Sequence, residues 1–221
     1  MDTVVLLSAG LDSAVLAAAE ARTARVHPVY VSAGLAWEAQ ELAALDALLV
    51  RPPYAGQLAP LARLTFTVTD LYSPTHWAIR GEPPAFDTPD EDVYLTGRNI
   101  VLLSKAAIYA AQQKISRTAI GPLAGNPFPD ATPEFFAALA RALSLGLAQP
   151  IEIAAPFADK EKSEVIALGL ELGVPLELTL SCMNPQQGQH CGRCSKCRER
   201  RDAFHEAGVA DPTAYAVAPL R

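Results

Sequence analysis

Near its start the chain reads Val4-Val5-Leu6-Leu7-Ser8-Ala9-Gly10-Leu11-Asp12-Ser13, an apolar run that ends in a short polar turn. The run is typical of a strand buried on both faces, and the Ala-rich segment after the turn favours a helix. Exposed N–H groups and the positive end of a helix dipole converge at such a turn, where they can hold an anion. This stretch therefore predicts an α/β fold with a phosphate site after its first strand.

The polar residues of the turn have separate expected roles. The hydroxyls of Ser8 and Ser13 can donate hydrogen bonds to phosphate oxygens, and Gly10 allows close approach of the backbone. Asp12 would repel phosphates, so we expect it either to bind a Mg²⁺ ion that bridges them or to cap the helix. An ordinary capped β–α turn is the alternative for the whole segment.

Short β-rich runs and longer helical runs alternate along the rest of the chain. Strands are expected at 3–8, 26–32, 64–70, 118–123 and 151–156, and helices at 12–22, 36–49, 99–113, 133–145, 160–172 and 194–207. This alternation predicts a doubly wound, mostly parallel five-stranded sheet with right-handed crossovers. The length of 221 residues fits one domain, 1–221, with residues 179–201 as its zinc-binding segment.

In sheets of this kind, ligands bind beyond the carboxyl ends of the strands, near the point where the strand order reverses. We therefore expect one binding mouth, formed by residues 8–13, 33–38, 70–77, 121–130 and 157–162.

The four cysteines lie in one stretch with the spacing C-x8-C-x2-C-x2-C, at Cys182, Cys191, Cys194 and Cys197. Four thiolates at this spacing can close a tetrahedral shell around Zn²⁺ and leave no open position, which predicts a structural role. Two disulfides, an iron–sulfur cluster and free thiols are the alternatives. The basic flank also keeps a nucleic-acid-binding zinc module open.

The composition limits the function classes. Half of the residues are hydrophobic and 19% are charged, which argues against disorder. The formal net charge of -6 argues against a broad nucleic-acid surface, although it does not exclude a nucleotide. The N-terminus has no basic region of the kind that precedes a signal sequence, and no apolar stretch approaches the ~20 residues of a membrane helix. We therefore expect a cytoplasmic protein that does not associate with membranes.

The turn at 8–13 resembles the Ser-Gly-Gly-x-Asp-Ser loop of the N-type (PP-loop) ATP pyrophosphatases, which cleave ATP to AMP and pyrophosphate. Ala9 replaces the usual glycine, and we expect a negative φ there. Together, the turn and the cysteine segment resemble the 7-cyano-7-deazaguanine (preQ0) synthases of queuosine biosynthesis, in a diverged branch. Further matches, in the same order, are Gly97-Arg98-Asn99, Phe128-Pro129-Asp130, Pro133-Glu134-Phe135, Lys162-Ser163-Glu164-Val165, residues 169–176, Thr179, Ser181, Glu199-Arg200 and Asp211-Pro212.

The resemblance implies a ligase that adenylates 7-carboxy-7-deazaguanine and converts it, with ammonia and two ATP, to an amide and then to a nitrile. It implies structural zinc and ATP with Mg²⁺ as cofactors. The implied catalytic residues are Asp12, Ser13 and Lys162. The implied nucleotide-binding residues are Ser8, Ala9, Gly10, Leu11, Asp12, Ser13 and Arg98.

The region of the second strand departs from this family. Where the synthases carry an Asp-Tyr-Gly-Gln-type run, this chain has Tyr30-Val31-Ser32-Ala33-Gly34-Leu35-Ala36-Trp37-Glu38. We expect the substrate to be a planar heteroaromatic carboxylate. Glu38 would accept hydrogen bonds from the N–H groups of its guanine-like edge, and a tryptophan would stack on its ring. The expected substrate-binding residues are Trp37, Glu38, His76, Trp77, Asn99 and Asp130.

Structural alternatives accompany these roles. The two tryptophans can be packing residues, Asn99 can cap a helix, and Lys162 can be a solvated helix lysine. Three other functions also remain open: adenylation of a different carboxylate, pyrophosphatase chemistry in tRNA modification, and a non-catalytic zinc protein. The sequence leaves open whether the chain forms a homodimer.

Overall fold

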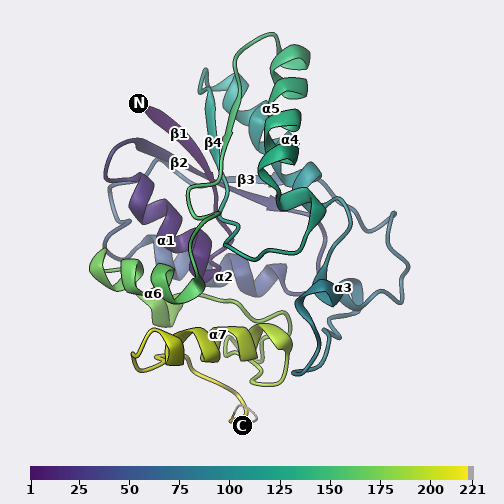
Figure 1. Cartoon of the computed structure of the whole chain (residues 1–221), viewed down its shortest axis with the longest axis vertical. Helices are drawn as coiled ribbons and strands as arrows, with labels where there is room; N and C mark the ends of the chain where they lie inside the picture. The colour runs from purple at the N-terminus through teal and green to yellow at the C-terminus, as the bar shows by residue number, and fades with distance from the viewer. Residues whose placement is uncertain (219–221) are drawn as a thin grey trace.

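The computed structural model describes residues 1–218, which contain one five-stranded sheet (Figure 1). Its strands are β1 (Asp2–Leu6), β2 (Arg25–Ser32), β3 (Ala62–Thr65), β4 (Arg117–Ala119) and β5 (Glu152–Ala154). They lie in the order β3-β2-β1-β4-β5, and every neighbouring pair is parallel. The order reverses between β1 and β4, which confirms the predicted doubly wound sheet. The end of the predicted domain 1–221, residues 219–221, lies outside the described residues.

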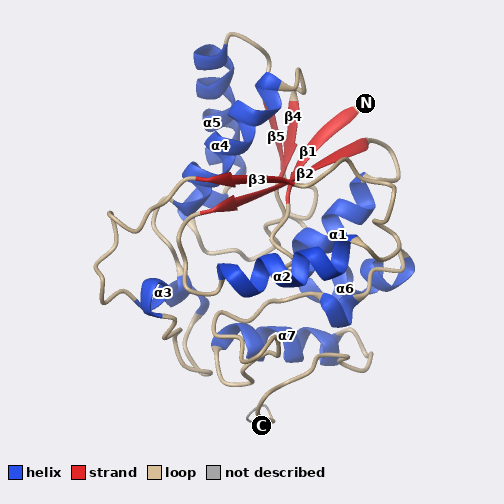
Figure 2. Ribbon diagram, turned by 180° about the vertical axis from the view of Figure 1, so that it is seen from behind, coloured by secondary structure: helices blue, strands red, loops and turns tan. Residues whose placement is uncertain are grey.

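Helices cover both faces of the sheet (Figures 1 and 2). One face packs against α1 (Leu11–Glu20), α2 (Glu38–Leu49) and α6 (Lys162–Glu171), and the other against α4 (Arg98–Gln112) and α5 (Pro133–Leu147). Val5 faces the first group of helices, whereas Val4 and Leu6 face the second. Because β1 is buried on both sides, its sequence is apolar without alternation.

Helix α6 approaches α1 closely at Gly169. A Cβ atom at this position would lie 2.8 Å from Cγ2 of Val15 and 3.2 Å from Cδ2 of Leu176. The glycine therefore sets the distance between the two helices, and with it the position of Lys162 at the start of α6.

Four of the predicted strands run too far at their carboxyl ends, and the first of them, expected at 3–8, ends at Leu6. The one expected at 64–70 ends at Thr65, although the N–H groups of Phe66 and Val68 still donate to the carbonyls of Ser32 (2.8 Å) and Ala33 (2.9 Å). The strands expected at 118–123 and 151–156 end at Ala119 and Ala154. The short helix α3 (Trp77–Arg80) and three 3-10 turns were not predicted: η1 (Asp90–Val93), η2 (Pro129–Ala131) and η3 (Leu176–Leu178).

The C-terminal segment lies along one side of the sheet domain. Its helix α7 (Ser195–Glu206) runs below α2 and α6 in the view of Figure 1. The cysteine segment also pairs with the chain beyond residue 201, because His190 exchanges backbone hydrogen bonds with Ala214 (3.0 Å) and Ala216 (2.8 Å). Backbone pairing with residues outside the predicted zinc-binding segment 179–201 therefore helps to hold this segment in place. Among the described residues, no helix has both the length and the apolarity needed to cross a membrane.

Candidate active site and metal centre

The phosphate loop, residues 8–13, is held by its own hydroxyls. The Oγ of Ser13 donates to the Gly10 carbonyl (3.0 Å) and accepts from the N–H of Ser8 (3.3 Å), while the Oγ of Ser8 accepts from the N–H of Gly10 (3.4 Å). Gly10 is the N-cap of α1, which begins at Leu11, so Asp12 lies in the first turn and is not the cap. The capping alternative for Asp12 is therefore wrong.

Ala9 has a φ of +61°, where we expected a negative value. Its side chain is fully buried. Left-handed backbone costs an alanine about 1–2 kcal/mol relative to right-handed backbone, so the loop holds this residue under strain. Gly10, which we expected to allow close approach of the backbone, has an ordinary φ of -58°. The left-handed residue of this turn is therefore the alanine and not the neighbouring glycine.

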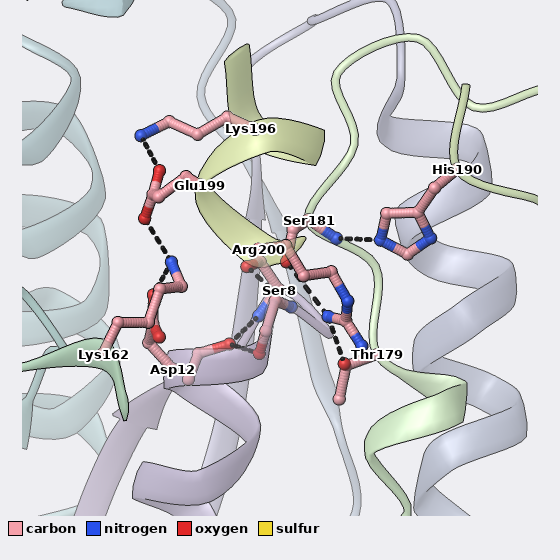
Figure 3. A network of polar contacts seen from close by, with 11 residues as sticks. Ser8, Asp12, Lys162, Thr179, Ser181, His190, Lys196, Glu199 and Arg200 are labelled. Carbon is pink, nitrogen blue, oxygen red and sulfur yellow. Dashed lines mark hydrogen bonds and ion pairs between the residues drawn. The ribbon is translucent and has the colours of Figure 1, made fainter. Parts of the chain in front are cut away.

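Asp12 belongs to a chain of charged side chains that joins three helices (Figure 3). The Nζ atom of Lys162, at the start of α6, contacts Oδ2 of Asp12 at 3.2 Å and also Oε1 of Glu199 on α7. The other oxygen of Glu199 accepts from Lys196 at 2.5 Å. Oδ1 of Asp12 is buried and has no hydrogen-bond partner among the described residues. That oxygen is available to a cation or a ligand.

The protonation states of this network follow from its charges. Burial alone would lower the pKa of Lys162, but Asp12 and Glu199 outweigh it and hold the pKa above its ordinary value. Burial would raise the pKa of Glu199, whereas Lys162 and Lys196 lower it to about 2. At neutral pH the network therefore has a positive charge at Lys162 beside the phosphate loop, fixed between two carboxylates.

A cavity of about 540 Å³ opens beyond the carboxyl ends of β1 and β4. It lies within the range usual for small-molecule sites. The phosphate loop and Lys162 line one part, and Trp37, Trp77 and Arg98 line another. Each of the five predicted mouth segments supplies at least one lining residue. Segments not expected there also contribute, namely 93–98, 180–183 and the exposed face of α7.

A second cavity of about 280 Å³ adjoins the first and is lined by apolar residues of β1, β2 and α4. The two cavities share part of the phosphate loop, Phe128, Arg98 and Glu41. Both Glu41 and Arg98 thus lie in the wall that the cavities have in common. The Nε atom of Arg98 is buried without a partner among the described residues.

Glu38 and His76 do not line either cavity. The Glu38 carboxylate accepts hydrogen bonds from the Ser32 hydroxyl (2.6 Å) and from the N–H groups of Ala33 (2.7 Å) and Gly34 (3.1 Å). His76 caps α3 through the N–H of Ala78 and stacks on Tyr72 with ring centroids 4.7 Å apart. Both side chains fix local turns, which the sequence pattern could not distinguish from a ligand contact.

Asn99 and Asp130 bind each other. The Asp130 carboxylate accepts from the backbone N–H of Asn99 (3.1 Å), and the Asn99 amide donates to the Asp130 carbonyl (3.0 Å). Gly97, with φ +77°, is the N-cap of α4, so the capping alternative for Asn99 does not hold. Asp130 lines neither cavity, whereas Asn99 reaches the smaller one. The pair anchors the start of α4 and thereby Arg98.

The two tryptophans stack on each other, with centroids 5.7 Å apart and planes inclined by 6°. They pack with Leu35, Val93 and Met183, and both border the large cavity. The two tryptophans therefore pack in the core, as the structural alternative expected, and also face the cavity, as a ligand-binding role requires.

Sequence reasoning missed Glu41 as a site residue and named Glu199 only as part of a motif. Glu41 is buried on a helix whose neighbours are apolar, and an acid on such a face is the signal that would have identified it. Glu199 follows Lys196 by one helical turn, a spacing usual for a solvated ion pair. Its contact with Lys162 depends on how α7 packs, which the sequence does not reveal.

The four cysteines converge on one point. Their Sγ atoms all lie within 4.8 Å of one another, and three of the pairs are 3.5–3.9 Å apart. Backbone N–H groups of Cys191, Asn184 and Arg193 point at two of the sulfurs at 3.2–3.4 Å, which favours thiolates. The group can bind a metal ion.

Buried polar side chains beside the cysteines in the sequence, Arg200 and His190, contact the rest of the fold (Figure 3). Arg200 is completely buried and donates to the Thr179 hydroxyl (2.8 Å), the Leu176 carbonyl (2.8 Å) and the Thr213 hydroxyl (2.6 Å). His190 accepts from the N–H of Ser181 at 3.1 Å, and burial lowers its pKa to about 3. The imidazole is therefore neutral, and it acts as a structural acceptor.

The fold and the loop define a class: a nucleotide-binding α/β protein whose phosphate loop follows the first strand at the switch point of a parallel sheet. Within that class, the chain belongs to the family described as "Queuosine biosynthesis protein QueC", whose model matches residues 2–208. The match covers the phosphate loop, Glu41 in the cavity wall and the four cysteines. The family predicted from the sequence is confirmed.

Curated relatives agree with the family. The chain is 35% identical over 222 residues to a 7-cyano-7-deazaguanine synthase of Methanothrix thermoacetophila, covering 96% of this chain and 97% of the relative. It is also 35% identical to the enzyme of Anaeromyxobacter dehalogenans, over 96% and 95% of the two chains. Among solved structures, a 4-thiouridine synthetase–RNA complex with bound ATP is 16% identical with a TM-score of 0.49, covering 94% of this chain and 51% of that one. A predicted tRNA methyltransferase subunit from Methanocaldococcus jannaschii is 15% identical with a TM-score of 0.46, over 95% and 89%.

Proposed function

We propose that this chain is an ATP-dependent 7-cyano-7-deazaguanine synthase. The observation that carries the proposal is one cavity in which the phosphate loop, the Asp12–Lys162–Glu199 network and a pair of tryptophans meet, in a chain of the QueC family. One end of the cavity can bind phosphate, and the other is lined by aromatic and polar side chains. This arrangement suits an enzyme that joins a nucleotide to a planar acceptor.

The residues of the phosphate end have distinct roles in this proposal. The loop at 8–13 holds phosphate oxygens with its N–H groups and its two hydroxyls. Oδ1 of Asp12, buried and without a partner, is the atom that would bind Mg²⁺. Lys162 carries the positive charge that stabilises pyrophosphate as it leaves. Arg98 contacts either a phosphate or the acceptor.

The chemistry follows from making a poor leaving group into a good one. An oxygen of the acceptor carboxylate attacks the α-phosphorus of ATP, and pyrophosphate departs to leave an acyl adenylate. Ammonia displaces AMP and forms the amide. A second adenylation, on the amide oxygen, allows loss of AMP and a proton to give the nitrile. The protein positions the reactants and stabilises charge, because ATP supplies the driving force.

We infer that the metal is zinc. A zinc ion with Zn–S bonds of about 2.3 Å sets its four sulfurs about 3.8 Å apart, close to the distances found here. An iron–sulfur cluster needs its cysteines around a larger core of several ions, and sulfurs this close leave too little room. The closed cysteine shell supports a structural role.

The proposal also includes the nitrogen donor, the location in the cell and the oligomeric state. Free ammonia as the nitrogen donor follows from the proposed reaction. Location in the cytoplasm agrees with four reduced cysteines at a metal centre. A homodimer stays a prediction, to be checked by light scattering.

The decisive experiment incubates the protein with ATP, Mg²⁺, ammonium and 7-carboxy-7-deazaguanine, with mass spectrometry of the acceptor. We expect the nitrile, with AMP and pyrophosphate as the nucleotide products. Asp12→Ala should abolish turnover and leave the fold and metal content intact, whereas Asp46→Ala, at an exposed site on α2, should not change the rate. Formation of ADP would contradict the class, and activity on an unrelated carboxylate alone would contradict the substrate.

A further inference from the structure

Glu41 lies one helical turn after Glu38 and occupies the place that the sequence had suggested for Glu38. It is 7% exposed, and it lines both cavities. The Tyr30 hydroxyl donates to its Oε2 at 2.9 Å. Within the described residues it forms no ion pair. A buried carboxylate without an opposite charge in contact is costly, and such groups are commonly kept for binding.

The other acids in the wall of the large cavity are already engaged or lie away from the tryptophans. Asp12 and Glu199 pair with Lys162, and Glu161 forms the capping box of α6. Asp202 and Glu206 lie on the C-terminal half of α7. Glu41 is therefore the acid that a ligand seated beside Trp37 would contact.

A carboxylate has two acceptor oxygens, so it matches two adjacent N–H donors. The edge of a guanine-like base presents an exocyclic amine, a ring N–H and then a carbonyl. Arg98 borders the same wall and can donate to that carbonyl. The edge of adenine instead presents an amine next to a ring nitrogen lone pair, which a carboxylate repels.

We propose that Glu41 recognises the amine and ring N–H of the guanine-like acceptor, with Arg98 beside it as donor to the carbonyl, and so selects the acceptor against adenine. This inference takes the identity of the acceptor from the proposed function, and it assigns Glu41 as the residue that recognises the acceptor.

The electrostatics of Glu41 agree with this role. Burial and the nearby Glu38 raise its pKa and Arg98, Tyr30 and Trp37 lower it, which leaves the pKa at about 7. Two N–H donors from a ligand would favour the ionised form. The ligand would thus add N–H donors to the hydrogen bond that Tyr30 already donates.

The test measures binding and does not depend on turnover. Both tryptophans of the chain border the large cavity, so intrinsic fluorescence reports on ligands there. The protein, with Mg²⁺ and a non-hydrolysable ATP analogue, is titrated with 7-deazaguanine and with 7-deazahypoxanthine, which lacks the exocyclic amine. We expect wild type to prefer 7-deazaguanine by about tenfold or more.

Two variants test the residue. In Glu41→Gln the affinities for the two ligands should become nearly equal, because the amide NH₂ would face the N–H donors of the ligand. Glu38→Gln is the matched control: it should lower the melting temperature but keep the wild-type preference. The inference is overturned if wild type does not discriminate, or if Glu41→Gln discriminates as wild type does. Discrimination by a wild-type protein that makes no nitrile would refute the proposed function and leave the role of Glu41 standing.

Discussion

At the scale of single residues, the phosphate loop keeps a backbone shape that its sequence does not favour. Ala9 is left-handed and buried, next to a glycine that is not left-handed. From the sequence we expected a negative φ at Ala9, because a left-handed alanine is unfavourable and residue type alone does not show that the surrounding fold imposes it.

Replacing Ala9 by glycine separates backbone strain from packing. Ala9→Gly removes a buried methyl group and adds freedom to the unfolded chain, but it relieves about 1–2 kcal/mol of strain, so the free energy of unfolding should change by less than about 0.5 kcal/mol. Ala14→Gly removes an equally buried methyl group from right-handed backbone in α1 and should cost about 2 kcal/mol. Urea unfolding of both variants measures the difference. Equal losses would mean that Ala9 is not strained.

The buried acid Glu41 predicts a dependence of stability on pH. Its folded pKa of about 7 exceeds the ordinary value of 4.5, so the folded state binds the extra proton between these values and stability falls as pH rises through that window. Glu41→Gln, which imitates the protonated acid, should become more stable than wild type by up to about 3 kcal/mol at pH 8 and by little at pH 5.

Chemical denaturation at a series of pH values checks this. Glu177→Gln, at an exposed position, controls for the loss of a negative charge. A stability difference between wild type and Glu41→Gln that stays constant from pH 5 to pH 8 would contradict the prediction.

At the scale of elements, patterning predicted the sheet, its main helices and the cysteine centre. Apolar runs and helical periodicity are local properties, so they can be recognised directly in the sequence. The strands predicted for β1, β3, β4 and β5 were too long because apolar residues continue past the end of each strand. The partners of Glu38, His76 and Asp130 could not be predicted, because each is a polar side chain satisfied by a turn or helix end whose geometry only the fold determines.

Two glycines in helices test how closely the elements pack. Gly169→Ala should destabilise by about 1–3 kcal/mol, because its Cβ would press on Val15 and Leu176 where α6 meets α1. Gly146→Ala, in the exposed part of α5 with nothing within 4 Å of the added atom, should stabilise by about 1 kcal/mol through helix propensity alone. Thermal melting distinguishes them, and a stabilised Gly169→Ala variant would show that α6 can move away from α1 without loss.

At the scale of the whole molecule, the metal centre and the cavity are one structure. Helix α7 carries Cys197 as well as Lys196 and Glu199, so the residue that fixes Lys162 is anchored one turn from a metal ligand. Arg200, on the same helix, connects η3 to the segment beyond residue 211. Loss of the metal is thus expected to disturb the phosphate site at a distance.

Metal removal should therefore affect stability and activity together. We expect one zinc per chain by elemental analysis, and a strong chelator should lower the melting temperature and abolish ATP turnover. Cys194→Ser should reproduce both effects, because an open shell loses binding energy that is also folding energy. Iron as the stoichiometric metal, or full activity in a metal-free protein, would contradict the prediction.

The order of the chain gives the Lys162–Glu199 contact a further meaning. The phosphate loop leaves the ribosome before the helix that completes its charge network, which follows roughly 10–40 s later at ordinary rates of translation. A nascent or prematurely terminated chain has the loop without Glu199 and the metal centre. If Glu199 holds Lys162 in place as proposed, such a chain is expected not to consume ATP.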